Sequence, residues 1–385
     1  MGVLSLPRHK ARKSMRVLAV IDTLEVGGAQ HHLLALARGL VSAGGEVLVA
    51  TSANEPMAAN FRAGGVPVWS LTRRSIKHVV SPTFARRLAH LAASGDFDLI
   101  HAHLYSSSVA GYVAARLTGL PLVVTHHSMN TWQCGWQRWM GRWVDRSADA
   151  VIAVSSNVAA AHRGAQVHTI LNGVEPPEQR WCAEEIAAAR SKLGIPRDAY
   201  TVCFVGRFSA DKNPLLFVDM AAAASAWDPN VHFLLMGDGP LRPPAEARAA
   251  ALGVSAQLHF VGFQPDARKL LQAADVLAVT SQSEGSPLVT LEAMAVGRPV
   301  VATNVGDIAL QVAHGEAGYV VPPGDAQALA DAVLALRDPA LRQRMGAAGL
   351  ARVRRHFHMQ SSLDQTFAVY REALGDPVDR LKLTA

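Results

Sequence analysis

Cysteine is scarce in this sequence of 385 residues, which contains only Cys134, Cys182 and Cys203. An odd number of cysteines without a C-x-x-C pair predicts neither a disulfide framework nor a zinc site, and it favours a reducing cytosol. Long apolar runs are also lacking. No stretch of about 18 residues is free of charges or helix breakers, so we expect no membrane-spanning helix. The first residues lack the apolar core of a signal peptide. These absences favour a cytoplasmic protein.

Aromatic residues make up 6% of the sequence, whereas 50% of it is hydrophobic. Alanine, valine and leucine dominate, which is typical of layered α/β structure. The net charge of +6 is partly concentrated in residues 1–14, which we interpret as a disordered basic leader, and in residues 352–355. Such basicity suits anionic substrates, an acidic membrane surface or nucleic acid. No helix-turn-helix, finger or RNP-like signature accompanies it, which disfavours nucleic acid.

Short apolar strands alternate with amphipathic helices from Arg16 onwards. Candidate strands are residues 17–21, 47–50, 66–69, 99–101, 122–125 and 151–154, followed after a proline-containing connection by 202–205, 232–236, 258–261, 276–279, 299–302 and 319–321. This alternation predicts two parallel sheets covered by helices on both faces. We therefore expect two Rossmann-like α/β domains facing each other across a cleft, with ligands at the carboxyl ends of the strands. The predicted domains are residues 15–180 and 181–356, and residues 357–385 form a helix and tail.

Two carboxylates mark the segment 283–295. Glu284 lies in a glycine-containing loop, and Glu292 lies in the helix that follows. Pro287 fits the first turn of that helix, where its missing N–H costs nothing. The free amides of the turn, together with the helix dipole, form an anion site. Carboxylates beside an anion site suit a ligand that is both phosphate and polyol, such as a sugar nucleotide.

Arg207 and Lys212 follow the first strand of the second series. The guanidinium offers a fork of donors and the ammonium a point charge, so together they could neutralise a diphosphate. The alternative is two solvated charges in a loop. Gly27 and Gly28 open a helix after the first strand, either to bring backbone amides close to a ligand or as a purely structural turn.

Histidines and tryptophans provide two further candidate sites. His101, His103, His126 and His127 lie at strand ends, where a structural or substrate-contacting role is favoured because no carboxylate or cysteine at supporting spacing indicates a metal. Four tryptophans recur at helical spacing with arginines between them: Trp132, Trp136, Trp139 and Trp143, with Arg138, Arg142 and Arg146. They predict either a core face or a surface for a membrane or a lipid-linked acceptor.

These motifs, in this order, resemble the retaining GT-B glycosyltransferases of family 4 over nearly the whole chain, from Arg16 to Phe357. The most specific part is the E-x7-E motif of Glu284 and Glu292. Supporting segments are residues 172–174, 206–212, 237–240, 293–302 and 321–325. The sequence departs from the family pattern at Asn213, Asp307 and Leu310, where the family often has glycine, glycine and glutamate.

The resemblance implies a role for each residue. Arg207 and Lys212 would hold the nucleotide diphosphate and stabilise the departing charge, and Glu292 would accept both ribose hydroxyls. Glu284 would lie at the donor sugar, and His127, rather than His126, near the donor sugar and acceptor. The C-terminal helix would cross back to the first domain. Further donor contacts are assigned to Gly27, Gly28, Gly206, Phe263, Gly285, Ser286, Pro287 and Leu288, and a hypothetical acceptor or membrane surface to Trp132, Trp136, Trp139, Arg142 and Trp143.

The implied reaction is the retaining transfer of a hexose or N-acetylhexosamine from a nucleotide diphosphate sugar, with a UDP-sugar favoured. The acceptor would be a hydroxyl of a glycan or lipid-linked molecule in cell-surface polysaccharide or glycolipid synthesis. Attack on the same face, with a diphosphate oxygen helping to deprotonate the acceptor, requires no cofactor and no metal. Attachment to the anionic inner face of the plasma membrane stays open. Alternatives are a sugar-nucleotide epimerase or phosphorylase on the same scaffold, and a non-catalytic sugar-nucleotide-binding protein.

Overall fold

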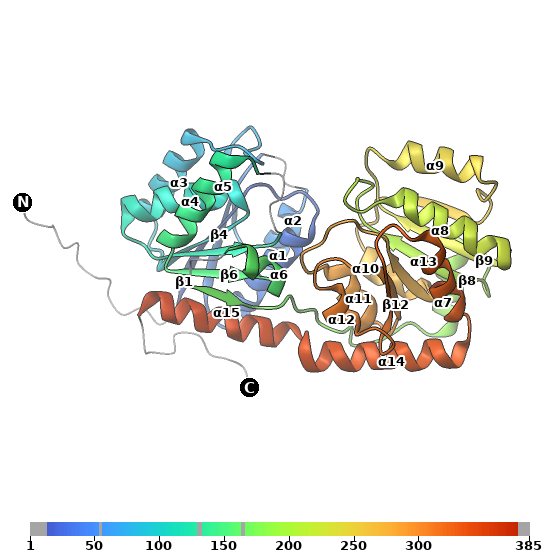
Figure 1. Ribbon diagram of the computed structural model, residues 1–385. Helices are drawn as coiled ribbons and strands as arrows, with labels where there is room; N and C mark the ends of the chain where they lie inside the picture. Colours follow the sequence, from blue (N-terminus) through green and yellow to red (C-terminus); the bar gives the residue numbers. More distant parts are fainter. Residues whose placement is uncertain (1–13, 54–55, 129–132, 163–165, 376–385) are drawn as a thin grey trace, which may run out of the picture. The chain divides into compact units, whose positions relative to one another are not determined.

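The computed structural model describes residues 14–53, 56–128, 133–162 and 166–375, and it divides the chain into two compact units (Figure 1). Unit 1 comprises Met1–Ile170 and Ser362–Ala385, and unit 2 comprises Leu171–Ser361. The division therefore falls about ten residues before the sequence-predicted boundary at 180. Residues 1–13 of the predicted leader lie outside the described residues.

Unit 1 contains a seven-stranded parallel sheet in the order β3-β2-β1-β4-β5-β6-β7. Its strands are β1 (Arg16–Ile21), β2 (Glu46–Ser52), β3 (Val68–Thr72), β4 (Leu99–His103), β5 (Leu122–His126), β6 (Ala150–Ala153) and β7 (Val167–Thr169). Its helices are α1 (Gly28–Ser42), α2 (Ala58–Ala63), α3 (Pro82–Ser94), α4 (Tyr105–Thr118), α5 (Gly135–Ser147) and α6 (Ser156–Ala161), together with most of α15 (Met359–Leu374).

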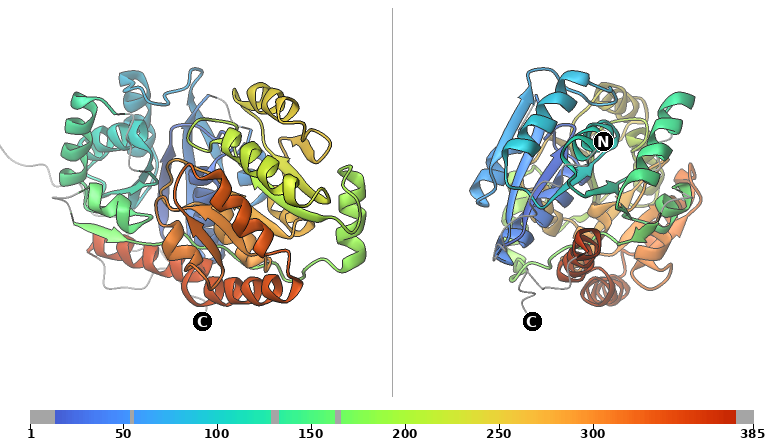
Figure 2. Two further views of the ribbon diagram at one scale, coloured as in Figure 1. Left: turned by 45° about the vertical axis from the view of Figure 1, so that its right-hand side comes forward. Right: turned by 90° about the vertical axis from the view of Figure 1, so that its left-hand side faces the viewer.

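Helices cover both faces of this sheet, and its central strands β4 and β5 are buried at every residue. Alternate residues, such as Leu18 and Val20 of β1, pack with α3 and α4 in one core, whereas His101 of β4 points to the other face and contacts Tyr370 of α15. In the left view of Figure 2, α15 is the darker of the two red helices and runs below the blue and green elements of unit 1. The chain thus returns to unit 1 for its last described helix.

Unit 2 contains a six-stranded parallel sheet in the order β10-β9-β8-β11-β12-β13. Its strands are β8 (Tyr200–Val205), β9 (Val231–Met236), β10 (Leu258–Gly262), β11 (Val276–Val279), β12 (Val300–Thr303) and β13 (Gly318–Val321). Its helices are α7 (Ala183–Lys192), α8 (Pro214–Trp227), α9 (Arg242–Ala251), α10 (Ala267–Leu270), the 3₁₀ turn η1 (Leu271–Ala273), α11 (Leu288–Ala295), α12 (Ile308–Val312), α13 (Ala326–Ala335) and α14 (Pro339–His356).

Two apolar cores sandwich the sheet of unit 2. One face of β8, including Val202 and Phe204, packs with α8, α9 and α13, and the other, including Cys203, packs with the layer that contains α11. Helix α8 has a capped start: the Asn213 side chain accepts a hydrogen bond from the Leu216 amide, and Pro214 occupies the first turn. The predicted architecture of two Rossmann-like domains is confirmed. Within the described residues, no helix is both long enough and apolar enough to cross a membrane.

Candidate functional site

The strand order of unit 2 reverses between β8 and β11, and the predicted site residues gather at that point. Lys212 follows β8, and Glu284 follows β11. Lys212 Nζ lies 2.6 Å from Glu284 Oε1, so the structure brings these two side chains into an ion pair. In open parallel sheets the crevice at such a switch point is where ligands bind.

The Glu284 carboxylate is held rather than mobile. Its Oε1 also accepts a hydrogen bond from Ser281 Oγ at 2.6 Å, and its side chain is 8% exposed. The loop around it is supported from three sides: Asn172 Nδ2 donates to the Ser286 carbonyl, Gln311 Nε2 donates to Ser286 Oγ, and the Asp307 amide donates to the Gly285 carbonyl. These supports fix the direction in which the carboxylate points.

Glu292 lies in α11 with its side chain partly buried. No hydrogen bond or ion pair of this carboxyl group is found among the described residues. Burial raises its pKa above the ordinary range, and the more distant charge of Arg268 opposes the rise only in part. A desolvated carboxyl group without a hydrogen-bond partner is energetically unfavourable by itself. It is suited to accept hydrogen bonds from the hydroxyl groups of a ligand.

Arg207 is exposed in the turn after β8. Two glycines of the neighbouring strand end determine the position of this turn. A Cβ on Gly237 would collide with the Gly206 carbonyl oxygen, and a Cβ on Gly239 would lie 2.6 Å from the Phe208 carbonyl oxygen. Both glycines also have φ values in the region that disfavours other residues, +142° and +151°. The glycine turn at 237–239 therefore has a packing role: it positions the loop of Arg207.

The start of α11 differs slightly from the one that the sequence predicts. Pro287 is the N-cap residue of α11, with extended φ and ψ of −66° and 126°, and the helix begins at Leu288. The prediction that Pro287 lies inside the first turn is therefore wrong by one position, because ψ of this residue is not helical. The first-turn amides of α11 still lack intrahelical partners, as at every helix start.

Phe263 follows β10 and is 52% exposed, so its ring is available for contact.

Unit 1 has its own switch point, between β1 and β4, and histidines gather there. His103 ends β4 and its Nδ1 lies 3.0 Å from Nε2 of His127, which follows β5. His32 of α1 approaches both, with ring centroids 5.0 Å from His127 and 6.0 Å from His103. Leu104, the next residue after His103, has φ of +70°, an uncommon value for leucine that is typical of functional turns.

Burial keeps these histidines neutral. It lowers the pKa of His103 and of His127 well below the ordinary value, and the neighbouring histidines lower both further. The pKa of His101 falls to about 3 for the same reason. His101 is fixed between two hydroxyls, with Nδ1 at 2.6 Å from Tyr370 Oη and Nε2 at 2.7 Å from Thr125 Oγ1. His103 Nε2 is buried without a hydrogen-bond partner among the described residues.

Gly27 and Gly28 stand at the start of α1, which follows β1. Gly27 is the N-cap residue and supplies no side-chain cap, and a Cβ built on Gly28 would meet no atom within 4 Å. The φ of Gly27 is extended, so no special backbone conformation explains this glycine. Open space in front of an uncapped helix start is compatible with the predicted contact to an anionic ligand.

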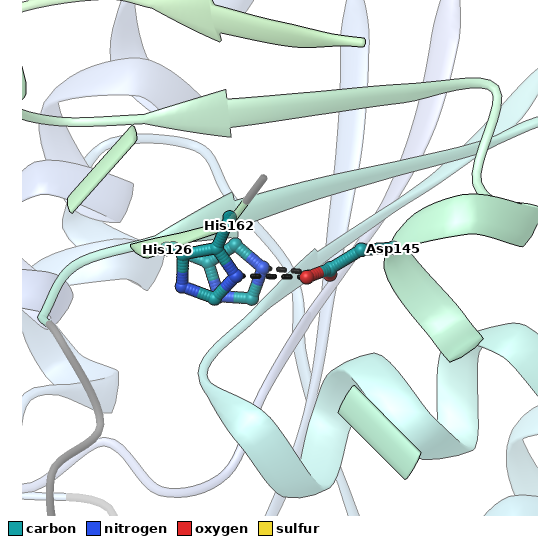
Figure 3. A group of neighbouring side chains, drawn as sticks. All are labelled: His126, Asp145 and His162. Atoms are coloured by element: carbon teal, nitrogen blue, oxygen red, sulfur yellow. Dashed lines mark hydrogen bonds and ion pairs between the residues drawn. The ribbon is translucent and has the colours of Figure 1, made fainter. Parts of the chain in front are cut away.

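A second group of polar side chains includes His126, the last residue of β5 (Figure 3). Asp145 of α5 accepts hydrogen bonds from His126 Nε2 and His162 Nδ1, both at 2.8 Å, and the two imidazole rings stack with centroids 3.6 Å apart and planes 15° apart. Their ligand atoms are close enough to be considered for a metal. Nearly parallel rings, however, point their nitrogens in parallel instead of converging on one ion, as tetrahedral coordination requires. The geometry fits a carboxylate bridging two imidazoles better than a metal centre.

Charge and burial oppose each other in this group. Burial works to raise the pKa of Asp145, but the hydrogen bonds and charge of His126 and His162 outweigh it and hold the pKa well below the usual range. Burial lowers the pKa of His126 despite the opposing effect of Asp145. The sequence reasoning missed the group because its three members are distant in sequence and carry no motif.

The tryptophans of α5 do not form a core face, so that interpretation is wrong for the three that are described. Trp136, Trp139 and Trp143 are 55%, 65% and 43% exposed, and Trp132 lies outside the described residues. The helix is instead attached by Met140 and Val144, which pack with the core beneath α4. Met140 and Val144 have the same spacing as Trp139 and Trp143 and lie one residue further along the helix, so periodicity could not decide which set faces inward.

The described residues therefore contain two separate groups, one at each switch point. Lys212 and Glu284 are in direct contact, and His127 contacts His103, whereas Arg207, Phe263 and Glu292 have no contact with the ion pair that a hydrogen bond or salt bridge marks. Sequence reasoning missed several supporting residues, namely His32, Ser281, Gly306 and Gln311. It included Asn172 in a supporting segment but assigned it no contact. A signal was available for Gly306, which lies in the loop three residues after the end of β12.

The fold defines the class of the protein first. The structure of Anabaena HepE in complex with UDP-glucose matches with a TM-score of 0.83 at 24% identity, covering 92% of this chain and 98% of HepE. Sucrose-phosphate synthase from Thermosynechococcus elongatus matches with a TM-score of 0.80 at 24% identity, covering 94% and 99%. The protein thus has the two-domain Rossmann-like fold of GT-B proteins.

Sequence comparisons then identify the family. Residues 185–352 match the family Glycosyl transferases group 1, and residues 26–177 match Glycosyltransferase Family 4. D-inositol 3-phosphate glycosyltransferase of Acidothermus cellulolyticus is 31% identical, over 91% of this chain and 87% of its own. Phosphatidyl-myo-inositol mannosyltransferase of Mycobacterium leprae is 30% identical, over 86% and 89%. The chain belongs to the GT-B glycosyltransferases of family 4, as the order of its motifs predicted.

Proposed function

We propose that this glycosyltransferase moves a hexose or N-acetylhexosamine from a UDP-sugar to a hydroxyl of a glycan or lipid-linked acceptor, with retention of anomeric configuration. The main support is the arrangement at the switch point of unit 2. There the Lys212–Glu284 ion pair is fixed, and the Glu292 carboxyl group is partly buried without a partner among the described residues. A site that binds a sugar nucleotide needs a cation to contact its phosphates and a carboxyl group to accept hydrogen bonds from its ribose diol.

Each group has a separate task in the proposed reaction. Arg207 and Lys212 neutralise the diphosphate of the donor and the charge that develops as it departs. Glu292 accepts the two ribose hydroxyls. Glu284, which already orients Lys212 at 2.6 Å, lies where the transferred sugar binds. His127 of unit 1, kept neutral by the burial that lowers its pKa, accepts or donates a hydrogen bond near the donor sugar and acceptor.

The bond changes balance without an additional cofactor. The bond between the anomeric carbon and the diphosphate oxygen breaks, and the acceptor oxygen attacks the same face of the sugar. A diphosphate oxygen takes the proton of the acceptor hydroxyl, so that the nucleoside diphosphate leaves with it. We propose that the charges of Arg207 and Lys212 make a divalent metal unnecessary, which predicts undiminished turnover in the presence of EDTA.

The names of the relatives support the choice of substrates. HepE has been solved with UDP-glucose, and the two sequence relatives are named for transfer to D-inositol 3-phosphate and to phosphatidyl-myo-inositol. A polyol hydroxyl on a phosphate-containing acceptor is therefore the first acceptor class to test, in glycolipid or cell-surface polysaccharide synthesis.

The ribose role of Glu292 is tested by calorimetry with UDP. Glu292→Gln keeps the shape of the side chain but loses its charge, and we expect UDP affinity to fall about tenfold to a hundredfold, the range of a hydrogen bond to a charged group. Glu316→Gln is the control, since Glu316 is an exposed glutamate of the same unit, paired with Arg352. Equal affinity of wild type and Glu292→Gln would contradict the ribose role.

The charge role of Lys212 is tested by turnover. Lys212→Ala should lower kcat by about a hundredfold or more, because it removes a cation that stabilises the departing diphosphate. Lys192→Ala, at an exposed lysine of α7, serves as the control. Two further experiments distinguish the alternative functions. With donor alone, formation of a new sugar nucleotide would indicate an epimerase. With donor and a panel of acceptors, a complete lack of turnover would indicate a binding protein. Anomeric analysis of the product by NMR tests retention.

A further inference from the structure

Helix α5 divides into three faces that the proposed reaction does not use. At roughly 100° per residue, Met140, Val144 and Asp145 fall on the inward side, where Val144 and Asp145 are buried. The exposed tryptophans Trp136, Trp139 and Trp143 fall on the outward side. Between these two faces runs a ridge of exposed arginines, Arg138, Arg142 and Arg146, at spacings of four residues.

Part of the tryptophan face packs on unit 1. The ring of Trp143 packs on Tyr112 of α4 with centroids 4.5 Å apart, and the ring of Trp139 lies parallel to that of Trp143 with centroids 6.5 Å apart. The Asp145 bridge to His126 and His162 fixes the opposite side of the helix to β5 and α6. An amphipathic helix held this firmly presents its aromatic rings with little conformational entropy left to lose.

The charge of the outward surface is of one sign. Arg138, Arg142 and Arg146 have no ion pair within the described part of the chain, and the acidic residue of the helix, Asp145, is buried. The loop next to the first turn continues the positive charge: Gln137 Nε2 donates to the His78 carbonyl at 3.4 Å, and Arg73 and Arg74 of that loop are exposed.

We propose that the Trp136–Trp139–Trp143 face of α5 and its arginine ridge form a docking surface for an anionic lipid membrane. Charge complementarity selects this occupant, because an unpaired row of arginines beside exposed indoles matches anionic headgroups above an apolar layer. The exposed face of a helix fits a flat lipid surface without a complementary groove. Indoles and guanidinium groups are also the side chains that settle at headgroup depth. The surface is independent of the proposed transfer reaction, and it would bring the enzyme to a lipid-linked acceptor.

Flotation with vesicles tests the tryptophan face. We expect the wild-type protein to float with vesicles of phosphatidylcholine and phosphatidylglycerol at about 2:1 and not with phosphatidylcholine alone. Trp136→Ala/Trp139→Ala should weaken binding at least about tenfold. The matched single pair is Trp139→Ala and Trp227→Ala, since Trp227 ends α8 of unit 2 and is 79% exposed. UDP binding and thermal unfolding confirm that each variant is folded.

A matched pair of triple variants tests the arginine ridge. Arg138→Gln/Arg142→Gln/Arg146→Gln should weaken binding about fivefold for each arginine, in a salt-dependent manner. Arg344→Gln/Arg354→Gln/Arg355→Gln removes the same charge from exposed positions of α14 and should leave binding unchanged. The proposal is overturned if wild type does not float, or if the α8 or α14 controls lose binding equally. It is also overturned if the protein is a dimer in solution that Trp136→Ala/Trp139→Ala dissociates, because the face then holds a second copy.

Discussion

Gly306 lies where the loop after β12 crosses the backbone of the Glu284 loop. Its φ is +57°, and a Cβ at this position would lie 2.6 Å from the Glu284 carbonyl oxygen and 2.5 Å from that of Gly285. The next residue, Asp307, donates its amide to the Gly285 carbonyl. This glycine therefore permits the close approach that supports the carboxylate beside Lys212.

Gly306→Ala should cost about 1–3 kcal/mol of stability in unit 2 and also lower turnover. The added methyl group must displace the Glu284 loop, and the Lys212–Glu284 geometry changes with it. Gly315→Ala is the matched control, because Gly315 also has positive φ, +86°, but nothing within 4 Å of an added Cβ. Urea unfolding and kcat are the measurements. A variant Gly306→Ala that behaves like Gly315→Ala in both would contradict this account.

The positions of single residues could be predicted where a motif fixed their surroundings, whereas their roles stay predictions. The sequence placed Lys212 after a strand and Glu284 in a glycine-containing loop, and their contact at 2.6 Å follows from the adjacency of β8 and β11. The supports from Asn172 and Gln311 could not be predicted, because their amides reach the Ser286 carbonyl and the Ser286 hydroxyl, respectively, from distant segments. Such contacts depend on tertiary packing and leave no local pattern.

The helices and strands could also be predicted in part from the sequence, and the errors have physical causes. Strands β8 and β9 were predicted within two residues of their observed bounds because they are continuous apolar runs. Strand β7 was missed, since it has three residues, Val167–Thr169, at the edge of its sheet and is partly exposed. The sequence left open which side of α5 faces the core for a different reason. The helix has more apolar residues than one buried face can hold, so some of them must be exposed.

Asp145 attaches α5 to the rest of unit 1. Asp145→Asn should destabilise unit 1 by about 2–4 kcal/mol, because one amide cannot accept hydrogen bonds from both His126 and His162. The control is Asp149→Asn, where an exposed carboxylate accepts one hydrogen bond, from the Leu122 amide at 2.8 Å. Urea unfolding followed by tryptophan fluorescence suits this test, since five of the seven tryptophans lie in unit 1. Equal unfolding midpoints for the two variants would show that the bridge does not stabilise the helix.

At the scale of the whole molecule, the two units differ in their buried histidines. His101, His103 and His126 of unit 1 are buried and His127 is partly buried, and all four have lowered pKa values. His232 and His259 of unit 2 have lowered pKa values too, but both are only partly buried. The two units should therefore respond differently to acid.

Unit 1 should lose stability as the pH falls from 7 to 5. Its histidines stay neutral when folded, while the unfolded chain takes up protons below about pH 6.5, so their contribution is present above that value and is lost toward the folded pKa. For His101, with a pKa of about 3, the loss between pH 6.5 and 5 is about 2 kcal/mol. Asp22 acts in the opposite direction: burial raises its pKa to about 6, so its contribution is present at low pH and is lost as the pH rises through 6.

Scanning calorimetry at pH 7 and pH 5 separates the two effects, because saturating UDP should raise only the transition of unit 2 and thereby identify it. The unit 1 transition should move down by more than that of unit 2, since its four histidines with lowered pKa values outweigh the single opposing carboxyl group. In Asp22→Asn the downward shift should be larger still: the amide oxygen can still accept from the Ser107 amide, now at 2.7 Å from Asp22 Oδ1, but it no longer takes up a proton. Transitions that move equally, or a smaller shift in Asp22→Asn, would contradict the assignment of acid sensitivity to the buried histidines of unit 1.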